Sequence, residues 1–189
     1  MLNFYKLIEI MVSLQLLIIS TMLPVYIPLP FPDNYSNSFE LPITWQIPTI
    51  ILLTLIFNKK VVFKAFTIYL ILGLFISPVF YQGGSVGYML TPNFGYLLGI
   101  YPLIKIIDNL NKKNEMNIGN FLIKGLFAII IMHLTGIVFN FILIIFYQKF
   151  NIFIYNIGKY SAGKILYHLI MLIPIIVLVK PIKYFKYNK

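Results

Sequence analysis

Long apolar blocks separated by short polar breaks dominate the pattern of hydrophobic and polar positions along the chain. Several blocks approach the roughly 20 residues that an α-helix needs to cross a bilayer. The pattern predicts an all-α membrane protein, a single transmembrane domain over residues 1–189 built as a bundle of about six transmembrane helices. The predicted spans cover residues 7–27, 43–57, 61–80, 94–107, 119–147 and 162–179.

Two of these spans, the second and the fourth, are short for a full crossing, and they contain Pro48 and Pro102. Short or irregular segments survive at membrane depth only where protein or a water-filled cavity shields their backbone. We therefore expect a cavity on that side of the bundle. The first span is expected to end in a proline-rich stretch, residues 24–32, and a short polar loop, residues 33–40, is expected to follow it. The first block lacks a small-residue cleavage motif, which favours a retained helix over a removed signal peptide.

Composition agrees with a membrane protein and excludes several other classes. Hydrophobic residues make up 60% of the chain and charged residues 11%, whereas soluble domains carry about a quarter charged residues. The net charge of +10 comes entirely from lysine. Proteins that read nucleic acids rely on arginine for bidentate contacts, so a lipid surface is the better partner and no nucleic acid is expected. The absence of cysteine excludes disulfides and thiolate metal sites, and no metal or cofactor is predicted.

The distribution of lysines predicts the orientation in the membrane. If both termini are cytoplasmic, the positive-inside rule is obeyed by twelve lysines against three. The twelve are Lys6, Lys59, Lys60, Lys64, Lys105, Lys112, Lys113, Lys124, Lys180, Lys183, Lys186 and Lys189, and the three are Lys149, Lys159 and Lys164. The sequence therefore predicts a multi-pass protein of the plasma membrane with an even number of spans and both ends inside the cell.

The sequence gives little support for an enzyme with acid–base or nucleophilic catalysis, or for a transporter that hydrolyses ATP itself. The chain has five carboxylates, and its two histidines are 35 positions apart without an acidic neighbour, so no nucleophile and base can be paired. We expect no enzymatic activity, and a lipid-modifying enzyme is the weakest alternative. No GxxxxGK[ST] phosphate loop is present, so energy for transport must come from an ion gradient or a partner. No internal repeat supports an inverted-repeat transporter.

Three polar and aromatic clusters fall on the predicted outer side. They lie at residues 41–46, 78–84 and 91–96 and combine amides, one hydroxyl, aromatic rings and glycines. Mostly apolar walls with a few placed polar groups are typical of a small-molecule pocket. The alternative for each aromatic residue is the belt of Trp and Tyr at bilayer interfaces, and Gln46 and Asn93 can equally be solvated in outer loops.

Three ionisable residues at or near membrane depth are further candidates. His133 lies inside the fifth span, where a polar residue either serves function or makes an interhelical hydrogen bond. Lys164 and His168 are expected near the outer start of the sixth span. Lys164 either neutralises a ligand carboxylate or extends its amine to water. The basic segment from Lys180 to Lys189 is expected to anchor the chain at the lipid surface.

The clusters resemble segments of the BioY family, the substrate-capture subunits of energy-coupling-factor biotin transporters. Leu41–Gln46 resembles the family's PITLQ segment, and residues 69–80 resemble YLLLGAIGLPVF. The Gly83–Gly84 pair followed by residues 90–99 resembles GG…LxGPTGGYLxGF, and residues 133–136 resemble a His-Leu-x-Gly piece of some members. Order and spacing agree from about residue 24 to 136, and the length and the six-span topology agree as well.

The resemblance implies a membrane subunit that binds biotin or a similar small molecule from outside. It also implies a transmembrane coupling protein and a pair of ABC-type ATPases as partners. The substrate-binding residues that the resemblance and the clusters together indicate are Trp45, Gln46, Gln82, Gly83, Gly84, Thr91, Asn93, Gly95, Tyr96, His133, Lys164 and His168. A helix that starts near Asn93 would offer free backbone N–H groups to a polar ligand group.

Some family features are missing from this chain. Phe94 replaces a family glycine, and the Asp-x-x-Lys of the last family helix has no counterpart, because no acid lies in that helix. Only Lys164 and His168 are ionisable at a similar depth. The first helix has no alanine, and its small residues are Ser13 and Ser20. A capture subunit for another small vitamin or metabolite, and a structural membrane protein without a ligand, therefore stay open as alternatives.

Overall fold

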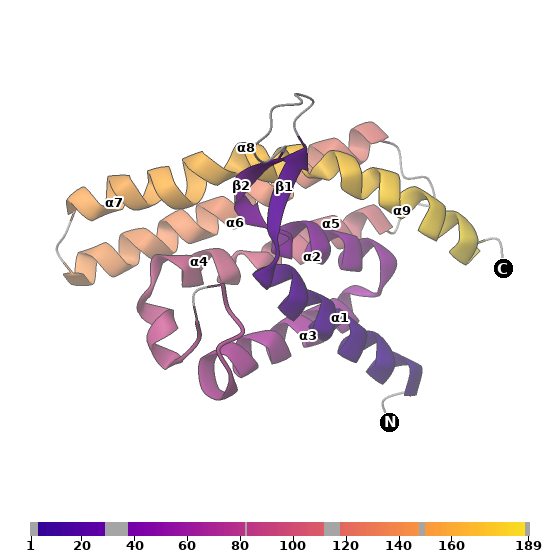
Figure 1. Ribbon diagram of the computed structural model, residues 1–189, viewed down its shortest axis with the longest axis horizontal. Helices are drawn as coiled ribbons and strands as arrows, with labels where there is room; N and C mark the ends of the chain where they lie inside the picture. Colours follow the sequence, from indigo (N-terminus) through magenta and orange to yellow (C-terminus); the bar gives the residue numbers. More distant parts are fainter. Residues whose placement is uncertain (1–3, 29–37, 82, 112–117, 148–149, 188–189) are drawn as a thin grey trace.

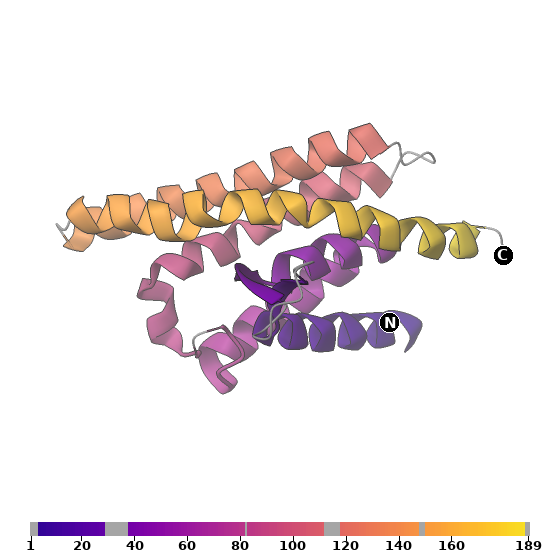
Figure 2. The same ribbon diagram turned by 45° about the horizontal axis from the view of Figure 1, so that its top comes forward.

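The computed structural model describes residues 4–28, 38–81, 83–111, 118–147 and 150–187, and helices dominate them. Along one side lie α6 (Ile118–Tyr147) and a long helical run made of α7 (Phe150–Ile157), η3 (Gly158–Ala162), α8 (Gly163–Ile170) and α9 (Leu172–Tyr187). Helices α1 (Phe4–Met22), α2 (Gln46–Ile56) and α3 (Lys59–Ile71) lie on the other side (Figures 1 and 2). Helices α4 (Pro92–Leu98) and α5 (Ile100–Asn111) pack against α6.

Three helical segments among the described residues are long and apolar enough to cross a membrane. They are Phe4–Met22, Ile118–Phe146 and Phe150–Pro181. Helix α2 is apolar but shorter, with 11 residues. Large apolar side chains such as Phe127, Ile145 and Val177 point outward and are exposed, as expected of surfaces that contact lipid tails rather than water. The prediction of a helical membrane protein is therefore confirmed in its coarse form.

The first predicted span was wrong at its end, because α1 stops at Met22 and a strand follows. Strand β1 (Pro24–Pro28) pairs antiparallel with β2 (Ser38–Thr44), with Tyr26 opposite Glu40. The prolines that end β1 lack an N–H and are incompatible with a helix interior, but an edge strand tolerates them. Of the predicted loop at residues 33–40, the last three belong to β2 and the rest lies outside the described residues.

The β1–β2 ribbon packs through alternate side chains. Leu41 and Ile43 are buried with Val25 and contact Met171 of the long helical run. Pro42, between them, is exposed. This alternation is the period of two that a strand imposes on its side chains, and it fixes the ribbon against the bundle by one face.

The second and third predicted spans were also too long. Residues 43–44 belong to β2, so α2 begins only at Gln46. Helix α3 is capped by Asn58, whose side chain accepts from the backbone N–H of Lys60 at 3.0 Å. It continues as a π-helix, η1 (Leu72–Ile76), and ends before Pro78. A short 3₁₀ helix, η2 (Val86–Leu90), follows and was not predicted.

The fourth and sixth predicted spans have other boundaries than expected. The fourth is two helices, α4 and α5, that meet at Gly99. The sixth begins at Phe150, twelve residues before the predicted start at 162. The π-helix η3 continues the helical run from Gly158 to Ala162, so there is no break before the predicted start. The fifth span agrees with α6 to within one residue.

Glycines allow α4 and α5 to approach α6 closely. A side chain at Gly99 would meet the backbone of Met132, with its Cβ 2.5 Å from the carbonyl oxygen, and one at Gly95 would overlap Phe139. On α6, a Cβ at Gly136 would overlap the ring of Tyr96. Small residues that bring two backbones together are the usual means of helix packing in membranes. The fold therefore presses Tyr96 against α6.

The helix ends gather at the two ends of the long axis of the molecule. The start of α1 and the end of α9 lie toward the same end, and the α2–α3 connection and the start of α6 lie at that end too (Figures 1 and 2). An ion pair joins α3 and α5 where these helices meet near that end, with Lys59 Nζ 3.3 Å from Asp108 Oδ2. The short helices η1 and η2, the end of α6 and the start of α7 lie at the other end (Figure 1).

Candidate functional site

A cavity of about 320 Å³ lies between the ribbon, the starts of α2 and α4, and the middle of α6 and α8. Its size falls at the lower end of the range of small-molecule sites, roughly 300–1,000 Å³. Six of the predicted residues line it: Gln46, Asn93, Tyr96, His133, Lys164 and His168. Sequence segments far apart in the chain thus meet at one place, as the three-cluster hypothesis requires.

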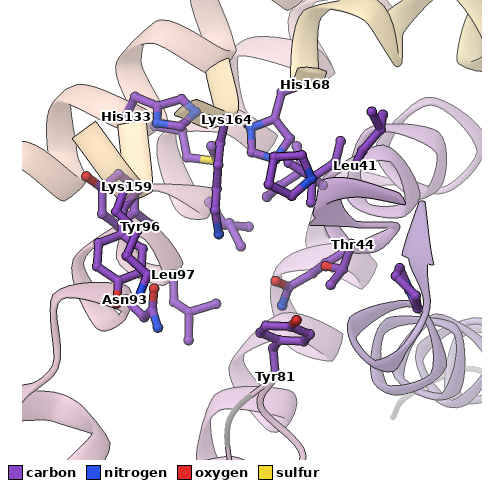
Figure 3. A pocket seen from close by; sticks show the side chains of 18 of the residues that line it. Leu41, Thr44, Tyr81, Asn93, Tyr96, Leu97, His133, Lys159, Lys164 and His168 are labelled. Atoms are coloured by element: carbon purple, nitrogen blue, oxygen red, sulfur yellow. Dashed lines mark hydrogen bonds between the residues drawn. The ribbon is translucent and has the colours of Figure 1, made fainter. Parts of the chain in front are cut away.

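Lys164 occupies the centre of this arrangement. Its side chain runs from α8 into the space between Asn93 and Tyr96 on one side and Thr44 and Tyr81 on the other (Figure 3). It is half-buried, and among the described residues no carboxylate lies within ion-pair distance of its amine. The ammonium group is therefore available to an anionic ligand group.

A chain of hydrogen bonds forms the wall beside Lys164. The Tyr96 hydroxyl and Ser161 Oγ lie 2.9 Å apart, and Ser161 Oγ lies 3.2 Å from His133 Nδ1. His133 Nε2 lies 3.1 Å from His168 Nδ1. Each of these groups can donate or accept when the histidines are neutral, so the direction of the whole chain can reverse to match a donor or an acceptor on a ligand.

The contact between the two histidines was not predicted. They are 35 positions apart in the sequence, yet α6 and α8 place them in contact, and both are buried. The sequence placed His168 near a helix start, whereas the helical run begins at Phe150 and His168 lies well inside it. The two rings form part of the hydrogen-bonded wall. Among the described residues no group of three or more potential metal ligands is present.

Ser161 connects the two halves of this wall, which makes it a test of the network. We expect Ser161→Ala to lower the midpoint of thermal unfolding, because the buried His133 Nδ1 and the Tyr96 hydroxyl lose their shared partner. An unsatisfied buried group costs about 1–3 kcal/mol. Ser85→Ala, at an exposed serine, serves as the matched control. Equal midpoints for the two variants in detergent would contradict the network.

The amides on the opposite walls already have protein partners. Gln46 Nε2 donates to the Tyr69 hydroxyl at 3.1 Å, and Asn93 lies within hydrogen-bonding reach of the Tyr88 hydroxyl. Each amide retains further donor or acceptor capacity. Partners of this kind hold the amides in place at the cavity wall before a ligand arrives.

Five other predicted residues are placed by the structure outside the cavity lining. Thr91 precedes α4, and its Oγ1 donates to the Tyr88 carbonyl at 2.7 Å. Trp45 packs on the buried cluster of the ribbon, and a Cβ at Gly95 would overlap Phe139. These residues position the lining rather than form it.

Gly83 and Gly84 follow Tyr81 in a turn closed by the pairing of Phe80 with Gly83. Gly83 has a φ of 107°, a conformation that favours glycine, and it exchanges two backbone hydrogen bonds of 3.0 Å with Phe80. A Cβ at Gly84 would overlap the carbonyl of Gly73. The turn carries Tyr81, which lines the cavity. Gln82, the remaining prediction, lies outside the described residues.

Part of the lining was absent from the predicted substrate-binding residues. Tyr88, Lys159 and Tyr160 line the cavity. Residues 40–44 of the ribbon line it as well, and of these 41–44 lie in a predicted cluster but were not assigned to the site. One signal was available, because Tyr160, Lys164 and His168 are spaced by four and share one face of a helix. It went unused because the helix was expected to begin only at residue 162.

Comparisons with known proteins agree with this architecture. The BioY family profile matches residues 2–180. A curated relative, "Probable biotin transporter BioY" from Lysinibacillus sphaericus, is 28% identical over 114 residues, which is 60% of this chain. The aligned stretch spans about half of that relative, 54% of its length.

A solved structure shows the same fold. The crystal structure of an S-component for biotin from an ECF-type ABC transporter superposes with a TM-score of 0.63 at 20% sequence identity. The superposition covers 97% of this chain and 95% of that one. With the family match over nearly the whole chain, these findings establish that this membrane protein belongs to the BioY family.

Proposed function

We propose that the protein captures biotin from outside the cell as the substrate-binding subunit of an energy-coupling-factor uptake transporter. The observation that carries the proposal is the position of the Lys164 amine. It lies in the centre of a cavity whose volume is in the range of small-molecule sites, and it has no carboxylate partner among the described residues. Membership of the BioY family supports the choice of ligand.

The chemistry of biotin is complementary to the lining. Its carboxylate would pair with Lys164, and hydrogen bonds to a charged group contribute about 1.5–3 kcal/mol. Its ureido ring has two N–H donors and a carbonyl acceptor, which suit the amides of Gln46 and Asn93. The apolar ring and chain would contact Leu97, Ile100 and other aliphatic side chains of the lining. Most of the site is thus apolar, with few oriented polar groups.

The proposed arrangement in the plasma membrane is a single multi-pass domain with six crossings and both termini in the cytoplasm. Support comes from the ends of α1 and α9, which lie toward one end of the molecule (Figures 1 and 2). Lys59 and Lys60 at the start of α3 lie toward that same end, in agreement with the positive-inside rule. The cavity then faces the exterior half of the bundle, where an external ligand would enter.

Transport requires partners in this proposal, because the chain has no phosphate loop of its own. A transmembrane coupling protein and a pair of ABC-type ATPases would supply the energy. Membrane lipid would cover the exposed apolar faces of α1, α6 and α9. Genes for such ATPases next to the gene for this chain would support the assignment.

Direct binding tests the proposal. Purified protein is expected to bind labelled biotin saturably at micromolar concentration or below. Asn93→Ala should weaken binding by about 1–3 kcal/mol if the amide makes a buried hydrogen bond to the ligand. Asn120→Ala, at an exposed asparagine near the start of α6, is the control. Absence of saturable binding by the unmodified protein would reject biotin.

One observation favours a second candidate, capture of another small vitamin or metabolite. The described cavity lining contains one carboxylate, Glu40, and its Oε2 accepts from the Tyr26 hydroxyl at 3.2 Å. The last helix offers no acid at the position where the family has Asp-x-x-Lys. Mass spectrometry of small molecules that co-purify with the protein separates the two candidates, because only one outcome has the mass of biotin.

A further inference from the structure

The cavity contains a second lysine, Lys159, which the proposed function does not use. Lys159 and Lys164 approach the ring of the same residue, Tyr160, with their Nζ atoms 5.3 Å and 5.5 Å from its centroid. Lys159 Nζ also lies 5.8 Å from the centroid of the Tyr155 ring. Cation–π attraction acts within about 6 Å of a ring centroid. The aromatic rings therefore hold two ammonium groups beside the same cavity.

Local helix geometry explains the pairing. Tyr155 and Lys159 are four positions apart, and so are Tyr160 and Lys164, which puts each lysine over a ring on its own side of the helix. The π-helix η3 contains both Lys159 and Tyr160. Single π-turns inside a longer helix occur often at functional sites. Here the turn places two adjacent residues, 159 and 160, in the cavity lining together with Lys164.

The charges of the two lysines are uncompensated within the described part of the chain. Neither ammonium has a carboxylate within 4.0 Å there, and the two like charges repel each other. An anionic group that approaches the cavity is attracted by both charges, so the attractive field is stronger than that of one lysine alone. The pair thus favours the approach of an anion such as a carboxylate.

The two lysines differ in exposure, and this suggests a division of roles. Lys159 is exposed, whereas Lys164 is half-buried at the centre of the cavity. A ligand that arrives from outside would meet the field of Lys159 before it reaches Lys164. Exposed charges at the edge of a site act mainly on the association rate, and buried partners act mainly on dissociation.

The geometry points to Lys159 as an electrostatic capture residue that draws small carboxylate ligands to the mouth of the cavity and passes them to Lys164. This inference rests on the proposed function, because biotin is the carboxylate used as the probe. Both ammonium groups lie near the ring of Tyr160, which therefore links the site of first attraction to the site of binding. Lys159 accelerates the association of the ligand and contributes little to the stability of the final complex.

The association and dissociation rates of labelled biotin test this role by rapid filtration of the purified, full-length protein. Lys159→Gln is expected to lower the association rate at low salt by about three- to tenfold and to change the dissociation rate by less than about twofold. Added salt should slow association to the unmodified protein and affect the variant less, because screening removes what the mutation already removed.

Lys180→Gln is the matched control, since it removes the same charge from an exposed site on α9, away from the cavity. Equal association rates for Lys159→Gln and Lys180→Gln would overturn the inference, and so would an effect of Lys159→Gln on dissociation alone. Both results leave biotin capture standing, provided that the unmodified protein binds biotin. If the unmodified protein does not bind biotin, the proposed function fails and this inference fails with it.

Discussion

Lys164→Gln is expected to weaken biotin binding by about tenfold to hundredfold while the midpoint of thermal unfolding stays within a few degrees of the original. The amine is the only group that we place against the ligand carboxylate, and a hydrogen bond to a charged group is worth about 1.5–3 kcal/mol, with each 1.4 kcal/mol equal to a tenfold change in affinity. Glutamine keeps most of the length of the side chain and removes its charge, so the packing of α8 should persist.

The ligand itself supplies a control for this prediction. Biotin amide lacks the negative charge, so it should bind the unmodified protein less tightly than biotin does. It should also bind Lys164→Gln and the unmodified protein with similar affinity. Isothermal titration with both ligands completes a cycle of protein and ligand changes. A variant that loses biotin and biotin amide equally would show that Lys164 supports the fold of the cavity rather than the carboxylate.

Gly99→Ala is expected to destabilise the protein and to weaken ligand binding together. The added Cβ would lie 2.5 Å from the Met132 carbonyl oxygen and 2.9 Å from its Cα, and backbone atoms inside a helix cannot turn aside. Overpacking of this kind costs about 1–3 kcal/mol, or a few degrees to about ten degrees in the thermal midpoint. Because α4 carries Asn93 and Tyr96, its displacement should also disturb the cavity.

Gly158→Ala provides the comparison for this variant, because a Cβ at Gly158 would meet no atom within 4 Å. Both changes add one methyl group to a glycine near a helix junction. Alanine also has the better helix propensity, so the control should be as stable as the original protein or slightly more stable. Similar thermal midpoints for Gly99→Ala and Gly158→Ala would show that the contact between α4 and α6 is less tight than described.

The sequence predicted the apolar helices well where a single feature, the length of an apolar block, decides the structure. The fifth span agrees with α6 almost to the residue. The predicted helix boundaries were wrong where a proline can either end a helix or belong to an edge strand. Pro24 and Pro28 ended a helix as expected, but they belong to a strand whose partner starts at Ser38. No local pattern predicts that pairing, since it depends on contacts between segments that are separated along the chain, β1 ending at Pro28 and β2 starting at Ser38.

The candidate site was predictable in its composition but not in its inner contacts. Gln46, Asn93 and Tyr96 stood out because amides and rings occurred at the starts of helices. The contact between His133 and His168 could not be read from the chain, because it depends on how α6 and α8 are rotated against each other. Lys159 was counted only as an outer lysine, since the helix that directs it to the cavity was expected to start three residues later.

In the ribbon that forms one wall of the cavity, packing against the bundle and accessibility depend on alternate residues. Residues 41–44 of β2 all line the cavity. Leu41 and Ile43 are buried and anchor the strand to the bundle, whereas the neighbouring Pro42 and Thr44 are more accessible. A change at 42 or 44 would thus alter the breadth of the chamber without repacking the interior. Ligand preference within this fold could drift, or be redesigned, through these two positions while the helices remain as they are.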